Sequence, residues 1–151
     1  MRVIANISEL DGLTGQEVAV GDWFLIDQQR VDRFAEATND RQWIHLDQER
    51  ARRESPFGGT IAHGFLTLSL LPFLVNASLR VDGVRFAVNY GLDKVRFPGP
   101  VMVGSRIRPR TVLGACANIA GGVQVEWQVT IEREAQSKPG CIAASLVRYY
   151  A

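Results

Sequence analysis

The sequence contains few of the residues that build disulfide frameworks and metal centres. Its 151 residues include only two cysteines, Cys116 and Cys141, and two histidines, His45 and His63. Two cysteines are too few for a disulfide scaffold and lack the spacing of metal ligands, so we expect both to be reduced. No third histidine or cysteine lies at ligand spacing, and the sequence therefore predicts no metal site.

Long apolar runs and an excess of one charge are also missing. No segment reaches the length of a membrane span, and the N-terminal residues lack the apolar core of a signal peptide. The 17 Lys and Arg residues balance 16 Asp and Glu residues, so the net charge of +1 creates no field that favours nucleic acid or an anionic membrane. We expect a cytoplasmic protein without nucleic-acid or membrane partners.

The hydrophobic content of 46% is sufficient for the core of one domain over residues 1–151. Helical patterns dominate its first half. Asp27 is placed to cap a helix that ends near Asn39, a residue type that tolerates the left-handed conformation. Asp47 is placed to cap a short helix over 48–54.

The segment from Ile61 to Val75 would be apolar on almost every side if it were helical, which is typical of a buried helix. Thr60 is its predicted N-cap. Pro72 has no N–H to donate to the carbonyl of Leu68, so we expect a kink or an early end there. This segment is the predicted central helix of the domain.

Alternating apolar and polar residues dominate the second half of the chain. From Val123 to Ile131 every odd residue is apolar and every even residue is polar, which predicts an antiparallel strand with one wet face. About five strands and one buried helix indicate an α+β domain in which a single sheet wraps the helix. The other predicted strands lie over 17–26, 84–97 (one strand or a pair around Gly91), 106–113 and 141–150.

Asp40 and His45 lie five residues apart in a segment without periodicity, which we expect to be a loop. Alone, Asp40 is more often a capping or solvated carboxylate, and His45 is more often a core histidine. Together, a carboxylate and an imidazole are able to hold one water and exchange protons with it, as the hydration of an activated double bond requires. Proton transfer by positioned groups contributes about 10²–10⁴-fold to rate. The pair predicts acid/base chemistry.

Gly64 lies near the start of the apolar segment, and two interpretations are open for it. It allows close packing of the helix against the sheet, or it lets a developing oxyanion approach the free N–H groups of the first helical turn. His63 either orients the loop through its ring nitrogens or fills space, and we favour the second.

These two segments resemble those of the MaoC-like (R)-specific enoyl-CoA hydratases, the hydratase 2 group, in the branch related to nodulation protein N. The family motif runs Gly-Asp-x-Asn-Pro-x-His and later His-Gly-Met-Leu. Here residues 39–45 are Asn-Asp-Arg-Gln-Trp-Ile-His and residues 62–66 are Ala-His-Gly-Phe-Leu. Similarity to mycobacterial-type members extends over nearly the whole chain, through 90–98 and 147–149.

The resemblance implies a hot-dog fold, an antiparallel sheet around a long central helix, and a homodimer whose two sheets become continuous. The family's catalytic pair carries over to Asp40 and His45, and its oxyanion donor to the N–H of Gly64. No cofactor is implied.

Three residues of the first motif depart from the family pattern. Asn39 replaces Gly, and we expect a left-handed turn to tolerate it. Gln42 takes the place of the family's Asn in the polar network, and Trp43 replaces Pro. These last two changes are expected to alter loop shape and acyl preference, and Trp43 is the first candidate to line an acyl pocket.

Two sets of cations are candidates for the phosphates of the acyl carrier. Lys94 and Arg96 alternate along one predicted strand, as do Arg106, Arg108 and Arg110 along another. Solvated strand faces are the alternative, and we favour that alternative for the second set.

The expected activity is the reversible addition of water to a trans-2-enoyl thioester of coenzyme A or acyl carrier protein, giving the (R)-3-hydroxyacyl product. Two other functions stay open. A hot-dog thioesterase would hydrolyse the thioester with similar catalytic residues. A partner subunit of a heterodimeric dehydratase would need a second protein for activity. Fold alone does not decide among them.

Overall fold

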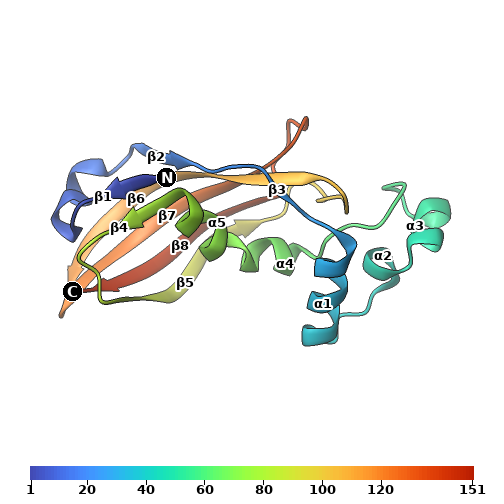
Figure 1. Cartoon of the computed structure of the whole chain (residues 1–151), viewed down its shortest axis with the longest axis horizontal. Helices are drawn as coiled ribbons and strands as arrows, with labels where there is room; N and C mark the ends of the chain where they lie inside the picture. The colour runs from blue at the N-terminus through green and yellow to red at the C-terminus, as the bar shows by residue number, and fades with distance from the viewer.

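The computed structural model describes residues 1–151 as one large sheet with two consecutive helices lying along a single face (Figure 1). The sheet is antiparallel, in the order β2-β6-β7-β8-β5, and β3 also pairs with β6. Side chains of its covered face join a cluster of 23 buried hydrophobic residues. Its strands are β2 (Glu17–Val20), β3 (Phe24–Leu25), β5 (Phe86–Arg96), β6 (Arg106–Ile119), β7 (Gly122–Arg133) and β8 (Cys141–Tyr150).

Helices α4 (Gly64–Ser69) and α5 (Leu71–Ser78) form the central helical segment. Three others, α1 (Gln28–Thr38), α2 (Trp43–Leu46) and α3 (Gln48–Glu54), gather beyond one end of the sheet (Figure 1). No helix is long and apolar enough to cross a membrane. At the other end, β1 (Arg2–Ile4) pairs in parallel with β4 (Leu79–Val81), next to the short turns η1 (Ile7–Glu9) and η2 (Asp11–Leu13).

The alternation predicted for β7 is confirmed, because its odd residues from Val123 to Ile131 are all buried. The main sheet has six strands rather than about five, since the predicted strand over 17–26 divides into β2 and β3. The division lies opposite Pro109 of β6, which has no N–H to donate to a neighbouring strand. Gly21 passes this point so closely that a Cβ there would lie 2.7 Å from the proline ring.

The remaining strand predictions differ only in extent. The segment over 84–97 forms one strand, β5, with an irregular register between Asn89 and Gly91. Strand β6 continues past the predicted 106–113 to Ile119, across a register shift between Leu113 and Ala115. A bulge of this kind bends a long strand and lets pairing resume beyond it.

The helix caps predicted at Asp27 and Asp47 are confirmed. The Asp27 side chain accepts from the N–H of Arg30 at 2.8 Å, and α1 closes at Asn39 with a left-handed φ of 59°. The Asp47 side chain accepts from the N–H of Arg50 at 2.9 Å and starts α3.

The prediction that Thr60 caps the central helix is wrong, because α4 begins at Gly64. The backbone before it is extended and paired: the N–H of Ala62 donates to Val101 at 2.8 Å, and Val103 donates to Thr60 at 3.0 Å. The predicted kink is confirmed, since α4 and α5 are separated at Leu70 and Pro72 lies in the first turn of α5.

Thr111 of β6 is fully buried, and its hydroxyl has no hydrogen-bond partner. An unsatisfied buried polar group costs about 1–3 kcal/mol. Thr111→Val keeps the branched shape without this hydroxyl, so we expect the melting temperature to rise by several degrees. Thr130→Val on the neighbouring strand, whose side chain is only half-buried, is the matched control and should change stability by no more than about 0.5 kcal/mol. A lower melting temperature for Thr111→Val would contradict this explanation.

Candidate active site

The structure brings the side chains of Asp40, His45 and His63 together, with one ligating atom from each lying within 4.8 Å of the others. Asp40 is exposed in the segment after α1, whereas both histidines are buried. His45 lies in the one-turn helix α2, so the prediction of an entirely irregular segment is wrong for its second half. This turn places the imidazole near the Asp40 carboxylate.

The ring of His45 has a fixed orientation. Its Nδ1 lies 2.7 Å from the carbonyl oxygen of Ile61. A carbonyl only accepts, so Nδ1 carries the hydrogen and Nε2 keeps its lone pair. Burial is the main cause that lowers the pKa of His45 from the usual 6.5, which keeps the ring neutral at neutral pH.

Gln28 of α1 supports this turn from the other side. Its amide donates to the His45 carbonyl at 2.7 Å and accepts from the hydroxyl of Thr60 at 2.7 Å. We expected Gln42 to belong to this network, but Gln42 is exposed at the N-cap of α2 and makes no capping bond there. Sequence reasoning missed Gln28 because a glutamine in the first turn of a helix has no distinguishing signal.

His63 lies immediately before α4 and contacts both members of the pair. Its Nε2 lies 2.9 Å from the Asp40 carbonyl oxygen, and its ring stacks on that of His45 with centroids 3.8 Å apart and 25° between planes. Phe34 packs on it as well, with ring centroids 5.0 Å apart. The ring therefore fills space, as we favoured, and also makes a hydrogen bond.

The stacking of the two rings disfavours a metal ion bound by both histidines. A metal binds in the plane of an imidazole, along the lone pair of its nitrogen. Two rings that are stacked and only 25° from parallel cannot both direct an in-plane lone pair at one point between them. Tetrahedral coordination by Asp40, His45 and His63 would require one ring to leave the stack.

Gly64 is the first residue of α4, where helical N–H groups have no acceptor within the helix. A Cβ on Gly64 would lie 3.0–3.1 Å from the ring of Phe97, tighter than an ordinary contact. The aromatic ring that follows β5 thus lies directly against this glycine. Both interpretations of Gly64, close packing and access to an N–H, are compatible with this geometry.

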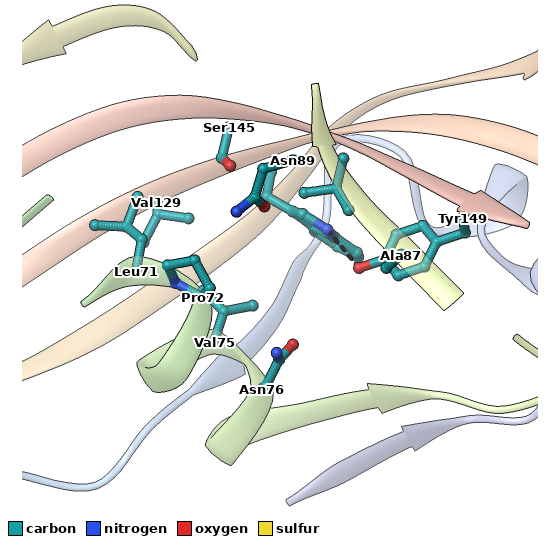
Figure 2. Close-up of a pocket in the computed structure, with 11 residues that line it drawn as sticks. Leu71, Pro72, Val75, Asn76, Ala87, Asn89, Val129, Ser145 and Tyr149 are labelled. Carbon is teal, nitrogen blue, oxygen red and sulfur yellow. Dashed lines mark hydrogen bonds between the residues drawn. The ribbon is translucent and has the colours of Figure 1, made fainter. Parts of the chain in front are cut away.

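A cavity of about 180 Å³ lies between α5 and strands β5, β7 and β8 (Figure 2). Trp127 and Tyr149 line part of its wall, and the indole N–H donates to the phenol oxygen at 3.0 Å. A second hollow of about 420 Å³ shares Leu71, Pro72 and two other lining residues with the first and extends to Phe65, next to Gly64. Together they form an apolar path from the start of α4 toward the core.

Trp43 lines neither of these hollows. It is half-buried in α2 with the guanidinium of Arg50 4.3 Å above its ring. The residues that line the path come instead from α4, α5, β5, β7 and β8. Two of them, Phe65 and Trp127, had been interpreted from the sequence as core residues.

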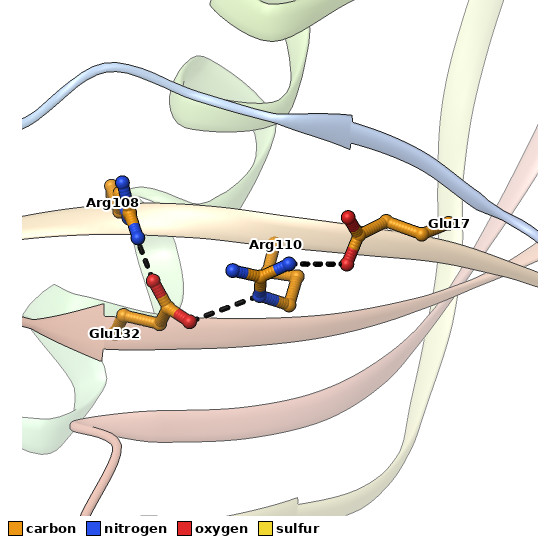
Figure 3. Close-up of polar contacts among 4 residues, drawn as sticks. All are labelled: Glu17, Arg108, Arg110 and Glu132. Atoms are coloured by element: carbon orange, nitrogen blue, oxygen red, sulfur yellow. Dashed lines mark hydrogen bonds and ion pairs between the residues drawn. The ribbon is translucent and has the colours of Figure 1, made fainter. Parts of the chain in front are cut away.

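The arginines of β6 form ion pairs rather than a free phosphate site. Glu132 accepts from Arg108 at 2.6 Å and from Arg110 at 2.9 Å, while Arg110 also pairs with Glu17 (Figure 3). Arg106 pairs with Glu134 in the same way. The interpretation that we favoured, a solvated strand face, is confirmed for this set.

Lys94 and Arg96 do not alternate regularly as predicted. Lys94 has a left-handed φ of 52°, inside a register shift between Asp93 and Arg96. It shares a surface hollow with Gln128 and other residues, away from the cluster of Asp40 and the histidines. Arg96 is exposed and donates to the carbonyl of Val95 at 2.7 Å.

Comparison with known proteins identifies the family. The family model described as MaoC like domain matches residues 10–135. The chain is 49% identical to 3-hydroxyacyl-thioester dehydratase Z of Mycobacterium tuberculosis, over the full length of both. It is 44% identical to nodulation protein N of Rhizobium leguminosarum bv. viciae, over 91% of this chain and 87% of that one.

The fold matches that of a solved hydratase of this type. The structure of R-hydratase PhaJ1 from Pseudomonas aeruginosa aligns with a TM-score of 0.75 at 22% identity, covering 97% of this chain and 88% of that one. The hot-dog arrangement expected from the sequence is therefore confirmed. The chain belongs to the MaoC-like dehydratase family and is a hydro-lyase.

Proposed function

We propose that this protein catalyses the reversible hydration of a trans-2-enoyl thioester to the (R)-3-hydroxyacyl thioester. The observation that carries the proposal is the pairing of an exposed Asp40 carboxylate with a buried, neutral His45 whose Nε2 is free, beside the start of α4. The names of the dehydratase and hydratase relatives support the same reaction. We place the reaction in the cytoplasm, where both free cysteines stay reduced.

In the hydration direction, the thioester oxygen accepts a hydrogen bond from the N–H of Gly64. Water bound between Asp40 and His45 gives a proton to one of them as its oxygen bonds to C3. The electron pair of the double bond moves toward C2 and the thioester, and the Asp40–His45 pair, which has taken up the proton of the water, delivers a proton to C2. Loss of one such oxyanion donor commonly costs about 3 kcal/mol of transition-state stabilisation. The reaction requires no metal, cofactor or covalent intermediate.

The apolar path from Phe65 toward Trp127 and Tyr149 is our candidate for the acyl site, in place of Trp43. Because Phe65 follows Gly64 in the chain, this placement would let the acyl chain extend inward while the thioester stays at the start of α4. Arg96 adjoins Phe97 and remains our candidate for a phosphate of coenzyme A or acyl carrier protein. Lys94, which points to another part of the surface, is the weaker member of the original pair.

Activity should be assayed with enoyl-CoA substrates of graded length, followed by chiral analysis of the product. The proposal predicts loss of the enoyl absorbance and formation of the (R)-alcohol. Release of free thiol from an acyl-CoA, with the enoyl absorbance unchanged, would instead identify a thioesterase. Activity that appears only with a second protein would identify a subunit of a heterodimer.

Hydration is expected to weaken as the pH falls, with the midpoint of the acid limb of kcat/KM below 6.5. Burial lowers the pKa of His45. Its Nε2 therefore stays able to accept a hydrogen bond from water at pH values below the pKa of a free imidazole. The same shift means that folding stability declines below about pH 6.5, because the unfolded chain binds the proton more tightly. Thermal melts at each pH separate the two effects. An acid midpoint above 6.5 in folded protein would contradict the role of neutral His45.

The homodimer expected from the family remains a proposal, and β5 is its basis. This 11-residue edge strand pairs only with β8 and exposes Phe86, Val88, Tyr90 and Leu92, each by 45% or more. Exposed apolar edges of this length are normally paired or covered. We propose that two copies pair through β5.

Light scattering at micromolar concentration should therefore give the mass of a dimer. Val88→Lys places a charge on the proposed interface and should yield monomers. Val20→Lys is the matched control, since Val20 is 41% exposed on β2 at the opposite edge of the sheet. A fully active monomeric wild type would contradict the proposed assembly.

A further inference from the structure

His63 contacts each of the three groups that the proposed function assigns to catalysis. Its backbone leads directly into Gly64, and its Nε2 lies 2.9 Å from the Asp40 carbonyl oxygen. Its ring covers one face of His45, with centroids 3.8 Å apart.

The bond to Asp40 fixes the protonation pattern of His63. Because the carbonyl only accepts, Nε2 carries the hydrogen, and in the neutral ring Nδ1 is then the nitrogen with the lone pair. This Nδ1 is buried without any partner. Such a buried acceptor destabilises the fold, and a phenyl ring of similar outline would avoid that cost. Filling space therefore does not explain an imidazole here, whereas the hydrogen bond from Nε2 does.

Asp40 depends on that bond for its position. It follows the left-handed residue Asn39, is exposed, and makes no side-chain hydrogen bond. His63 ties its backbone to the residue that begins α4. On the other side, His45 is held at its edge by Ile61 and on its face by His63.

We propose that His63 is a positioning residue that sets the Asp40 backbone and the His45 ring relative to the N–H of Gly64. The inference rests on the proposed hydratase function for its kinetic consequences, but its structural consequences are independent of the reaction. The titratable groups that face His63 are Asp40, from the segment after α1, and His45, from α2. Its other aromatic neighbour, Phe34 of α1, carries no charge.

Two variants separate the two contacts. His63→Phe keeps the stack on His45 and loses the bond to Asp40. His63→Gln keeps an N–H donor of similar reach and loses the ring. Ser78→Ala is the matched control, because it removes another buried hydrogen-bonding side chain, in α5 and away from the site.

On a short enoyl-CoA, we expect His63→Phe to fold with an unchanged or higher melting temperature and to lose about 10²-fold in kcat, the cost of misplacing a reacting group by about 1 Å. KM should change by less than about threefold, because an interaction with the transition state is what is lost. His63→Gln should recover at least about tenfold of the lost kcat, and Ser78→Ala should retain wild-type kcat. A folded His63→Phe protein with wild-type kcat would overturn the proposal.

NMR tests the same proposal without any reaction. In His63→Phe, ¹⁵N relaxation at Asp40 and Arg41 should show order parameters falling from about 0.85 toward 0.6 or less. In His63→Gln, the titration midpoint of His45 should rise toward that of a free imidazole as its face becomes solvated. If both stay at wild-type values, His63 does not position the pair, whether or not the wild type is a hydratase. An inactive wild type with both changes present would refute the proposed function alone.

Discussion

Replacement of Asp40 by Asn, or of His45 by Gln, is expected to lower kcat on a short enoyl-CoA by about 10²-fold or more, the lower range of general acid/base catalysis. Asp40→Asn keeps the size of the side chain and removes its charge. His45→Gln keeps a polar contact and removes the titrating ring. KM should change little in either, because the lost interaction is with the water that reacts rather than with the acyl chain.

The double variant tests whether the two groups act on one water. Groups that serve the same step lose their effect together, so the double variant should be little slower than either single one. Strict additivity of the two losses would instead mean separate steps. Glu36→Gln, at another exposed carboxylate in α1, is the control for loss of charge, and thermal melts are the control for folding. A single variant that keeps more than about a tenth of wild-type kcat would refute the assigned roles, given the magnitude of this effect.

Local signals in the sequence were sufficient to predict the helices and strands that surround the site. Asp27 and Asp47 cap their helices through bonds to a residue three positions away, and Asn39 closes α1 by its own backbone conformation. The alternation of β7 follows from one buried face, which is also a local pattern. Asp40 and His45 were identified for the same reason, because their relation depends on only five residues of chain.

Contacts between distant segments account for what the sequence did not predict. Thr60 did not cap a helix because its neighbours pair with residues about 40 positions later, such as Val101. One of the two partners of Arg110 is Glu17, 93 residues away, and periodicity cannot indicate whether such an arginine is free. His63 meets Asp40 across 23 residues, and its orienting hydrogen bond depends on that tertiary contact. The pairing of Asp40 with His45 could thus be predicted from residues 39–45 alone. The contact of this segment with residues 62–66 could not.

Gly64→Ala is the change expected to separate packing from catalysis at the start of α4. The added Cβ would lie 3.0–3.1 Å from the ring of Phe97, so that ring or the helix must shift. A shift of about 1 Å in the N–H that binds the thioester oxygen can cost about 10²-fold in rate. We expect kcat to fall by that amount and the melting temperature to fall only modestly, because Phe97 is 41% exposed and has room to move.

The variant Phe97→Leu makes the two interpretations of Gly64 distinguishable. A leucine removes the ring edge that the new Cβ would meet, so Gly64→Ala combined with Phe97→Leu should regain the stability lost by Gly64→Ala. Its kcat should stay low if the methyl group also occupies the approach of the thioester oxygen to the N–H, and Phe97→Leu alone supplies the reference rate. Recovery of both stability and kcat in the double variant would show that the glycine serves packing against Phe97. A folded Gly64→Val protein with wild-type kcat would refute the oxyanion assignment outright, because a branched side chain at the first residue of α4 is expected to push the thioester oxygen away from that N–H.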